Sequence, residues 1–170
     1  MAAVRRILRS RRLRVGDHMA LDDDIRTLSG VALFQSLSRE HLRLLAFGAD
    51  HIDAPAGHRL YREGDIAESA FVMEHGEVGL FHTRDDGERL HLDTVRPGDV
   101  LSELALIAES QRLTEAVAIT DARLLRLDRR LFMRIVEEYP GLASTLYDRI
   151  ASDLQALVRK LDRLSPHFDG

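Results

Sequence analysis

The middle of the chain consists of short segments in which apolar and polar residues alternate, and this texture constrains the fold more than any other feature. From about residue 50 to residue 127 such short segments recur, for example at 90–92, beside more continuous apolar runs such as 70–73, with turn-forming glycines between them. Period-two segments between closely spaced turn signals are typical of antiparallel sheets. Gly87 follows two aspartates and predicts a hairpin turn, because glycine tolerates a positive φ. This region therefore predicts an antiparallel β-roll.

Helical periodicity flanks the predicted roll on both sides. Residues 20–30 predict a short leading helix. A second helix is predicted to begin after Ser38, a good N-terminal cap, and to end at Gly48. After the roll, a helix is predicted to run to about Glu138, where Pro140 interrupts it or starts the next one. The order of elements indicates an α+β domain: a jelly-roll-like antiparallel β-roll with N-terminal helices and a long C-terminal helix.

The last helix carries a sustained apolar stripe, with charged residues on its other face. A helix of this kind can pack on its own roll or on a copy of itself. The stripe recurs every three or four residues and consists of Leu142, Leu146, Ile150, Leu154, Leu157, Leu161 and Leu164.

These patterns divide the chain into four segments. We expect a basic, disordered leader at 1–18, helices at 19–48, the roll at 49–128 and the C-terminal helices at 129–165.

Charge is distributed unevenly between the leader and the rest of the chain. The net charge is −4, but residues 1–18 hold six arginines and one acid, so the remainder carries 18 basic and 27 acidic residues. Such an acidic body repels nucleic acid and disfavours DNA binding by the main domain. The leader has three interpretations: an arm that touches RNA or a membrane, a transit-like segment, or a translation start upstream of the true one at Met19.

Several classes of protein are disfavoured by what the sequence lacks. The absence of cysteine excludes disulfides and thiol chemistry, and fits the reducing cytoplasm that we expect as the location. No apolar run of about 18 residues predicts a membrane span. We see no P-loop and no nucleophile–base constellation, so neither an enzyme nor a cofactor is expected. No metal site is predicted either, because the histidines of the roll are scattered without a His-x-His pair: His51, His58, His75, His82 and His91.

One helical turn is predicted inside the strand-rich region, at residues 103–107 of the segment 98–114. The N-terminus of a helical turn offers free N–H groups that suit an anion. Arg112 follows Glu103 by nine residues and is suited to a bidentate contact with phosphate oxygens. A carboxylate near a phosphate makes sense if it accepts a hydrogen bond from a sugar hydroxyl. A ribose-phosphate ring presents both groups together.

From about residue 33 to residue 164 the chain resembles the cyclic-nucleotide-binding domain family, which includes catabolite-activator-type regulators, cyclic-nucleotide-dependent kinase regulatory subunits and gated channels. Residues 55–65 look like the early turn of the family's roll and residues 71–77 like its central hairpin. The sequence Gly-Asp-x-x-x-Glu-Leu-Ala-Leu-Ile at 98–107, followed by Arg112, resembles its phosphate-binding cassette.

The resemblance implies roles for individual residues. Glu103 would bind the ribose 2′-hydroxyl and Arg112 the cyclic phosphate, with support from the backbone of Leu104 and Ala105. The chain departs from the family at Ser102, where glycine is usual and a side chain crowds the ligand or alters the turn. It also has Gln111 in place of proline. Bulkier residues replace small ones after the arginine, so the complete predicted ligand-binding set is Ser102, Glu103, Leu104, Ala105, Arg112, Leu113 and Thr114.

The resemblance also implies a function. Cyclic AMP or cyclic GMP would bind to the cassette, the terminal helix would close over the base and signal, and the chain would form a homodimer through that helix. We expect no DNA-binding helix-turn-helix, because the chain stops at Gly170, and therefore a separate downstream protein partner. The alternative is a degenerate β-roll that binds no nucleotide and serves in dimerisation or protein interaction.

Overall fold

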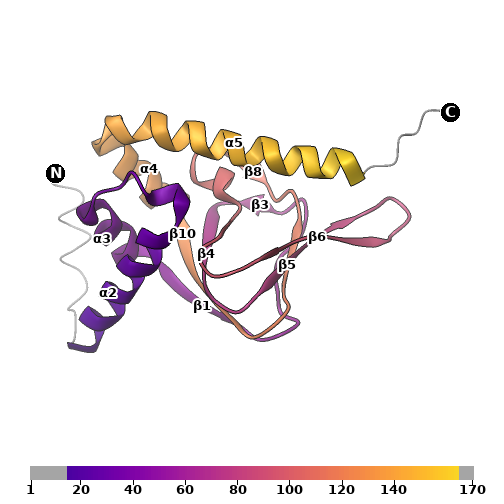
Figure 1. Cartoon of the computed structure of the whole chain (residues 1–170), viewed down its shortest axis with the longest axis horizontal. Helices are drawn as coiled ribbons and strands as arrows, with labels where there is room; N and C mark the ends of the chain where they lie inside the picture. Colours follow the sequence, from indigo (N-terminus) through magenta and orange to yellow (C-terminus); the bar gives the residue numbers. More distant parts are fainter. Residues whose placement is uncertain (1–14, 165–170) are drawn as a thin grey trace.

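The computed structural model of the protein describes residues 15–164. Helical elements stand at both ends of the described chain and once within the roll (Figure 1). They are α2 (Val15–Gly30), the 3₁₀ turn η1 (Ala32–Phe34), α3 (Arg39–Gly48), the 3₁₀ turn η2 (Glu103–Leu106), α4 (Arg129–Glu138) and α5 (Pro140–Leu164).

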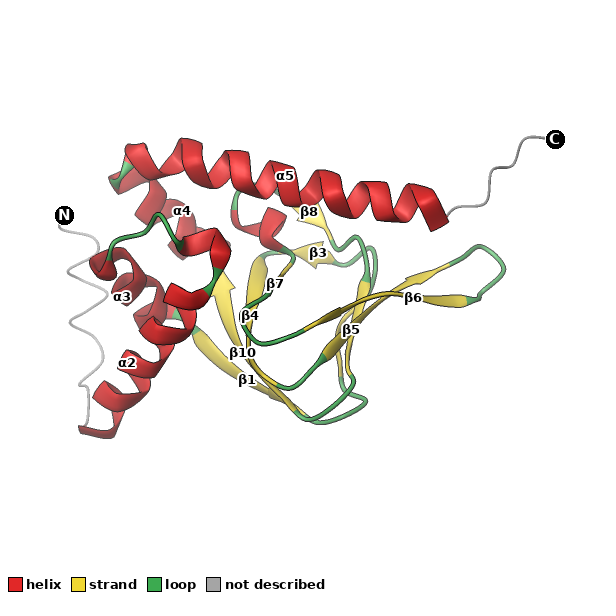
Figure 2. Cartoon of the chain, in the orientation of Figure 1, coloured by secondary structure: helices red, strands yellow, loops and turns green. Residues whose placement is uncertain are grey.

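The strands between them form two four-stranded antiparallel sheets and one two-stranded ribbon (Figure 2). One sheet has the order β1-β10-β4-β7, the other β2-β9-β5-β6, and the ribbon pairs β3 with β8. This arrangement confirms the predicted α+β roll. The strands are β1 (Asp50–Ala54), β2 (Arg59–Tyr61), β3 (Ile66–Ala67), β4 (Ser69–His75), β5 (Val78–Thr83), β6 (Arg89–Val95), β7 (Val100–Leu101), β8 (Ser110–Gln111), β9 (Glu115–Ala118) and β10 (Ala122–Asp128).

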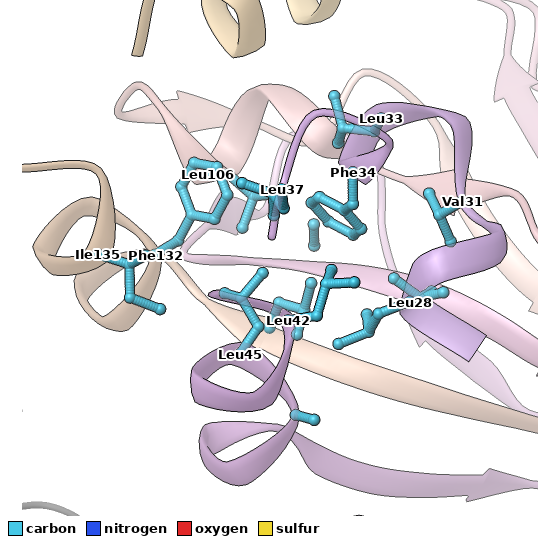
Figure 3. Close-up of a cluster of buried hydrophobic side chains, with 14 of the residues drawn as sticks. Leu28, Val31, Leu33, Phe34, Leu37, Leu42, Leu45, Leu106, Phe132 and Ile135 are labelled. Atoms are coloured by element: carbon cyan, nitrogen blue, oxygen red, sulfur yellow. The ribbon is translucent and has the colours of Figure 1, made fainter. Parts of the chain in front are cut away.

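Strand β4 is buried on both faces along most of its length, because one face lines the roll and the other carries the helices; β10 beside it contributes to both clusters but exposes Arg123 and Arg126. Phe71 and Met73 of β4 belong to the cluster inside the roll. Val72, between them, belongs to a second cluster with helical residues such as Phe34 and Phe132. Figure 3 shows side chains of this second cluster converging from the N-terminal helices, η2 and α4. Full burial of each large apolar side chain stabilises the fold by roughly 1.5–3 kcal/mol.

The helix boundaries follow the local signals in the sequence. The Ser38 hydroxyl accepts a hydrogen bond from the His41 N–H at 3.3 Å and caps α3. The carboxylate of Asp128 accepts one from the Arg130 N–H at 2.8 Å and caps α4. Pro140 is the first residue of α5, where its missing N–H costs nothing. The structure has a helix in each stretch where the sequence predicts one.

The N-terminal boundary is the exception. Helix α2 already begins at Val15, so the predicted border between leader and helix at residues 18 and 19 falls inside it. The rest of the predicted leader, residues 1–14, lies outside the described residues, and its interpretations remain predictions. Within the described chain, no helix combines the length and the apolar character that crossing a membrane requires.

Helix α5 lies across the roll and contacts η1 and η2 (Figure 1). Leu146 and Ile150 are fully buried in the helix-side core, and Leu154 and Leu157 lie half-buried further along. These members of the apolar stripe therefore pack on the chain's own domain. The side chains of the other three predicted members, Leu142, Leu161 and Leu164, lie outside the described residues.

Candidate functional site

The predicted cassette lies between strands β7 and β8, and its sharpest bend is at Ser102. This serine has φ 58° and ψ 42°, and it is the one non-glycine residue with positive φ among those the structure describes. The left-handed conformation costs a residue with a Cβ roughly 1–2 kcal/mol. Its hydroxyl donates a hydrogen bond to the Tyr61 hydroxyl at 3.1 Å. The predicted helical turn follows at once, as the short 3₁₀ element η2.

A cavity of about 390 Å³ opens beside this turn. Three parts of the chain form its walls: the roll, through residues such as Leu80 and Thr94; the cassette; and helix α5, through Leu154 and Leu157. Its volume falls in the range of small-ligand sites, about 300–1,000 Å³. Six of the seven predicted ligand-binding residues line it: Ser102, Glu103, Leu104, Ala105, Leu113 and Thr114.

Arg112, the seventh, is not among the residues that line this cavity, and it packs against the Tyr61 ring. It is 6% exposed, and its Nη1 donates a hydrogen bond to the Ser69 carbonyl at 2.7 Å. The guanidinium carbon lies 4.4 Å from the centre of the Tyr61 ring and 5.4 Å from that of Phe71. It lines a second cavity of about 330 Å³, together with residues such as His58. Arg112 thus lines a different cavity from the other predicted site residues.

The described lining of the first cavity contains three acidic residues. Asp93, Asp99 and Glu103 line it, and no lysine, arginine or histidine is among the described lining residues. Arg112, the predicted phosphate ligand, lines the other cavity instead. Burial lowers the pKa of its guanidinium, and its Nε has no hydrogen-bond partner among the described residues.

Sequence patterns gave no sign of Tyr61, which lines both cavities. Its ring carries the arginine on one side, its hydroxyl meets the cassette, and burial raises its pKa. The residue lies 41 positions before Ser102, so only the closure of the roll brings them together. An aromatic residue within a short strand is ordinary core material and gives no local sign of this role.

Comparison with known proteins bears directly on this arrangement. A sequence model described as the cyclic nucleotide-binding domain matches residues 51–139, which is more than half of the chain. The chain belongs to the cyclic nucleotide-binding domain family. This family is a regulatory binding domain and not an enzyme family.

Named relatives of this family member include receptors and kinase subunits. The cyclic AMP receptor protein of Thermus thermophilus is 29% identical over 138 residues, which are 81% of this chain and 64% of the receptor. A cAMP-dependent protein kinase regulatory subunit of Aspergillus niger is 31% identical over 109 residues, 64% of this chain and 26% of the subunit. The chain therefore spans less than two-thirds of either protein.

Solved structures of the family share the fold. The structure of a cyclic nucleotide-binding-like protein from Brucella abortus has 47% sequence identity and a TM-score of 0.62, and the match covers 68% of this chain and 99% of that one. The catabolite activator protein of Thermus thermophilus has 29% identity and a TM-score of 0.67, over 78% of this chain and 62% of that one.

Proposed function

We propose that this chain is a regulatory module that binds a cyclic nucleotide, cyclic AMP or cyclic GMP, in the cavity beside η2. The observation that carries this proposal is the cavity itself, which joins most of the predicted cassette to the roll and to helix α5. Glu103 lines it at the position where the family resemblance implies a contact with the ribose hydroxyl.

The proposal requires Arg112 to exchange partners when the ligand binds. In the structure its guanidinium donates a hydrogen bond to the Ser69 carbonyl and packs on Tyr61. A cyclic phosphate offers it a bidentate, charge-assisted contact in place of that single carbonyl bond. The contribution of Arg112 to the binding free energy is then the difference in free energy between its phosphate-bound and Ser69-bound arrangements, and not the full strength of the phosphate contact.

Helix α5 is the proposed output of the module. Leu154 and Leu157 line the cavity, so a ligand that contacts them favours one position of the helix over others. We also propose that α5 mediates a homodimer. Tyr147 and Val158 are 38% and 42% exposed, and eleven residues make about three helical turns, which places both on one face.

Isothermal titration calorimetry with cyclic AMP and cyclic GMP tests ligand binding. We expect saturable 1:1 binding by the native chain, and binding at least about tenfold weaker in Glu103→Gln. The matched control is Glu109→Gln, which removes a carboxylate of the same segment that is 95% exposed; this variant should bind like the native chain. Absence of heat at millimolar nucleotide would overturn the proposal, and equal affinities of the two variants would overturn the site.

The second candidate function is a β-roll that binds no nucleotide and acts in dimerisation. It is favoured by the position of Arg112 outside the cavity and by the half-exposed Leu113 that lines the cavity instead. This candidate predicts no nucleotide heat together with a dimer in light scattering. Val158→Glu should then convert the dimer to a monomer, and Glu109→Gln should leave it intact.

A further inference from the structure

Three side chains that are far apart in the sequence meet where helix α2 packs on the first sheet. Asp24 comes from α2, His51 from β1 and Glu74 from β4. One donor atom from each lies within 4.8 Å of the others. The His51 Nε2 is 3.1 Å from a carboxylate oxygen of Asp24. This group lies outside both cavities described above.

The surroundings leave the two carboxylates poorly neutralised. Asp24 is 7% exposed, and burial raises its pKa to about 6. One oxygen of Glu74 is inaccessible to solvent and has no hydrogen-bond partner among the described residues. Arg123 lies near enough to Glu74 to affect its pKa, but its side chain is paired with Asp53 at 2.8 Å. A buried carboxylate oxygen without a partner is costly unless a cation or donor satisfies it.

The backbone of β4 is irregular at this point. The register between β4 and β10 shifts between Arg123, which lies opposite His75, and Leu124, which lies opposite Met73. Glu74 is therefore the extra residue of a β-bulge, a feature that redirects a side chain out of the regular alternation. Asp24 and His51 need no second carboxylate to form an ion pair with each other. The bulge adds one.

We propose that Asp24, His51 and Glu74 form a binding site for a divalent transition-metal ion, with Zn²⁺ as the ion whose donor preference it fits. Zinc accepts imidazole nitrogen and carboxylate oxygen in tetrahedral sites, at about 2.0–2.2 Å. Three protein ligands leave the fourth position to water. Ligand atoms at these bond lengths lie roughly 3.3 Å apart; the Asp24–His51 pair is already at 3.1 Å, so binding requires an approach of at most about 1.5 Å from the remaining contacts, which lie within 4.8 Å. The ion would tie helix α2 to strands β1 and β4.

Calorimetric titration of the full chain with ZnCl₂ tests the site, and the chain has no cysteine to compete for the metal. We expect one saturable site per chain and at least about tenfold weaker binding in Glu74→Gln, which keeps the shape of the side chain. His51→Ala should weaken binding similarly. His58→Ala removes an exposed histidine elsewhere on the roll and should leave the affinity unchanged.

Thermal unfolding provides a second readout that also controls for folding. Zn²⁺ should raise the unfolding midpoint of the native chain by several degrees relative to EDTA, because the ion binds only the folded arrangement. In EDTA, Glu74→Gln should unfold at or above the native temperature and gain nothing from Zn²⁺. No saturable binding by the native chain would overturn the proposal. So would binding that survives Glu74→Gln, or that falls equally in His58→Ala.

Discussion

Replacing Arg112 with alanine should destabilise the protein even when no nucleotide is present. The guanidinium donates a charge-assisted hydrogen bond to the Ser69 carbonyl at 2.7 Å, a contact of about 1.5–3 kcal/mol. Its position over the Tyr61 ring, at 4.4 Å, adds about 0.5–2 kcal/mol. Removal of a charge that is 94% buried offsets part of this loss, because burial of the charge is itself unfavourable.

Together, the lost hydrogen bond and ring contact, less the relief from no longer burying a charge, lower the free energy of unfolding by about 1–3 kcal/mol. For a chain of this size each kcal/mol lowers the melting temperature by about 2–4 °C. Urea denaturation followed by circular dichroism measures the free energy directly, with an unchanged m-value as the sign that the unfolded state is the same.

Arg96→Ala is the matched control. Arg96 is likewise paired, here through its Nε with a Glu77 carboxylate oxygen at 3.0 Å, but its side chain is 61% exposed. An exposed pair of this kind contributes about 0–1 kcal/mol. If Arg112→Ala costs no more than Arg96→Ala, the guanidinium is not held against Ser69 and Tyr61 in the free protein. The separation of Arg112 from the cavity would then be refuted.

Three further predictions follow from the backbone and from burial. Ser102→Gly relieves a left-handed strain of roughly 1–2 kcal/mol and removes a hydrogen bond of about 1 kcal/mol. Urea denaturation should therefore show little change in stability, while calorimetry should show nucleotide bound several-fold more tightly. An unchanged affinity would contradict the argument that the Ser102 side chain crowds the ligand. Gly76→Ala places a Cβ against the Asp121 carbonyl at a residue with φ +81°, so it should lower the melting temperature clearly more than Gly57→Ala, where φ is +83° and the space is open; equal losses would show that only φ matters. Asp24→Asn removes a group whose pKa rises from 3.8 to about 6 on folding. The folded state binds that proton more tightly, so protonated Asp24 adds to the free energy of unfolding below about pH 4. This stabilisation is lost as pH rises through 6 and amounts to at most roughly 3 kcal/mol. Urea titrations in EDTA should therefore find the variant gaining stability relative to the native chain between pH 4 and pH 7, and a constant difference would refute the burial argument.

The roll and the helices were predictable because their signals are local. Ser38 caps a helix, Pro140 begins one, and Gly87 closes a hairpin through contacts within a few residues. Even the apolar run at the start of β4, which is not a true alternation, is explained by its burial on both faces.

The face on which Arg112 lies was not predictable from spacing. Strand β8 ends at Gln111, so Arg112 lies in irregular chain where no alternation of sides fixes the direction of a side chain. Arg112 follows Glu103 by nine positions, but the η2 turn and strand β8 lie along this segment, and the spacing does not specify their combined geometry. In the structure Leu113 lines the cassette cavity and its neighbour Arg112 lines the other one.

The zinc-site residues were hidden for a related reason. His51 lies 27 residues from Asp24, and the side chain of Glu74 is directed by a bulge. No periodic pattern marks either relation. Scattered histidines in the sequence therefore do not argue against a site that the packing of a helix on a sheet assembles.

Helix α5 is anchored in the core near its N-terminal end, so a small tilt moves its C-terminal end by a larger distance. Its fully buried described side chains, Leu146 and Ile150, lie in its first half, whereas Leu154 and Leu157 border a hollow. From Ile150 to Leu164 the helix extends about 21 Å at 1.5 Å per residue, so a tilt of about 10° at Ile150 displaces its end by about 4 Å. A tilt of α5 that leaves the core packing unchanged would thus move the C-terminal end of the helix by about the length of a side chain. A partner bound at that end would then contact a different surface.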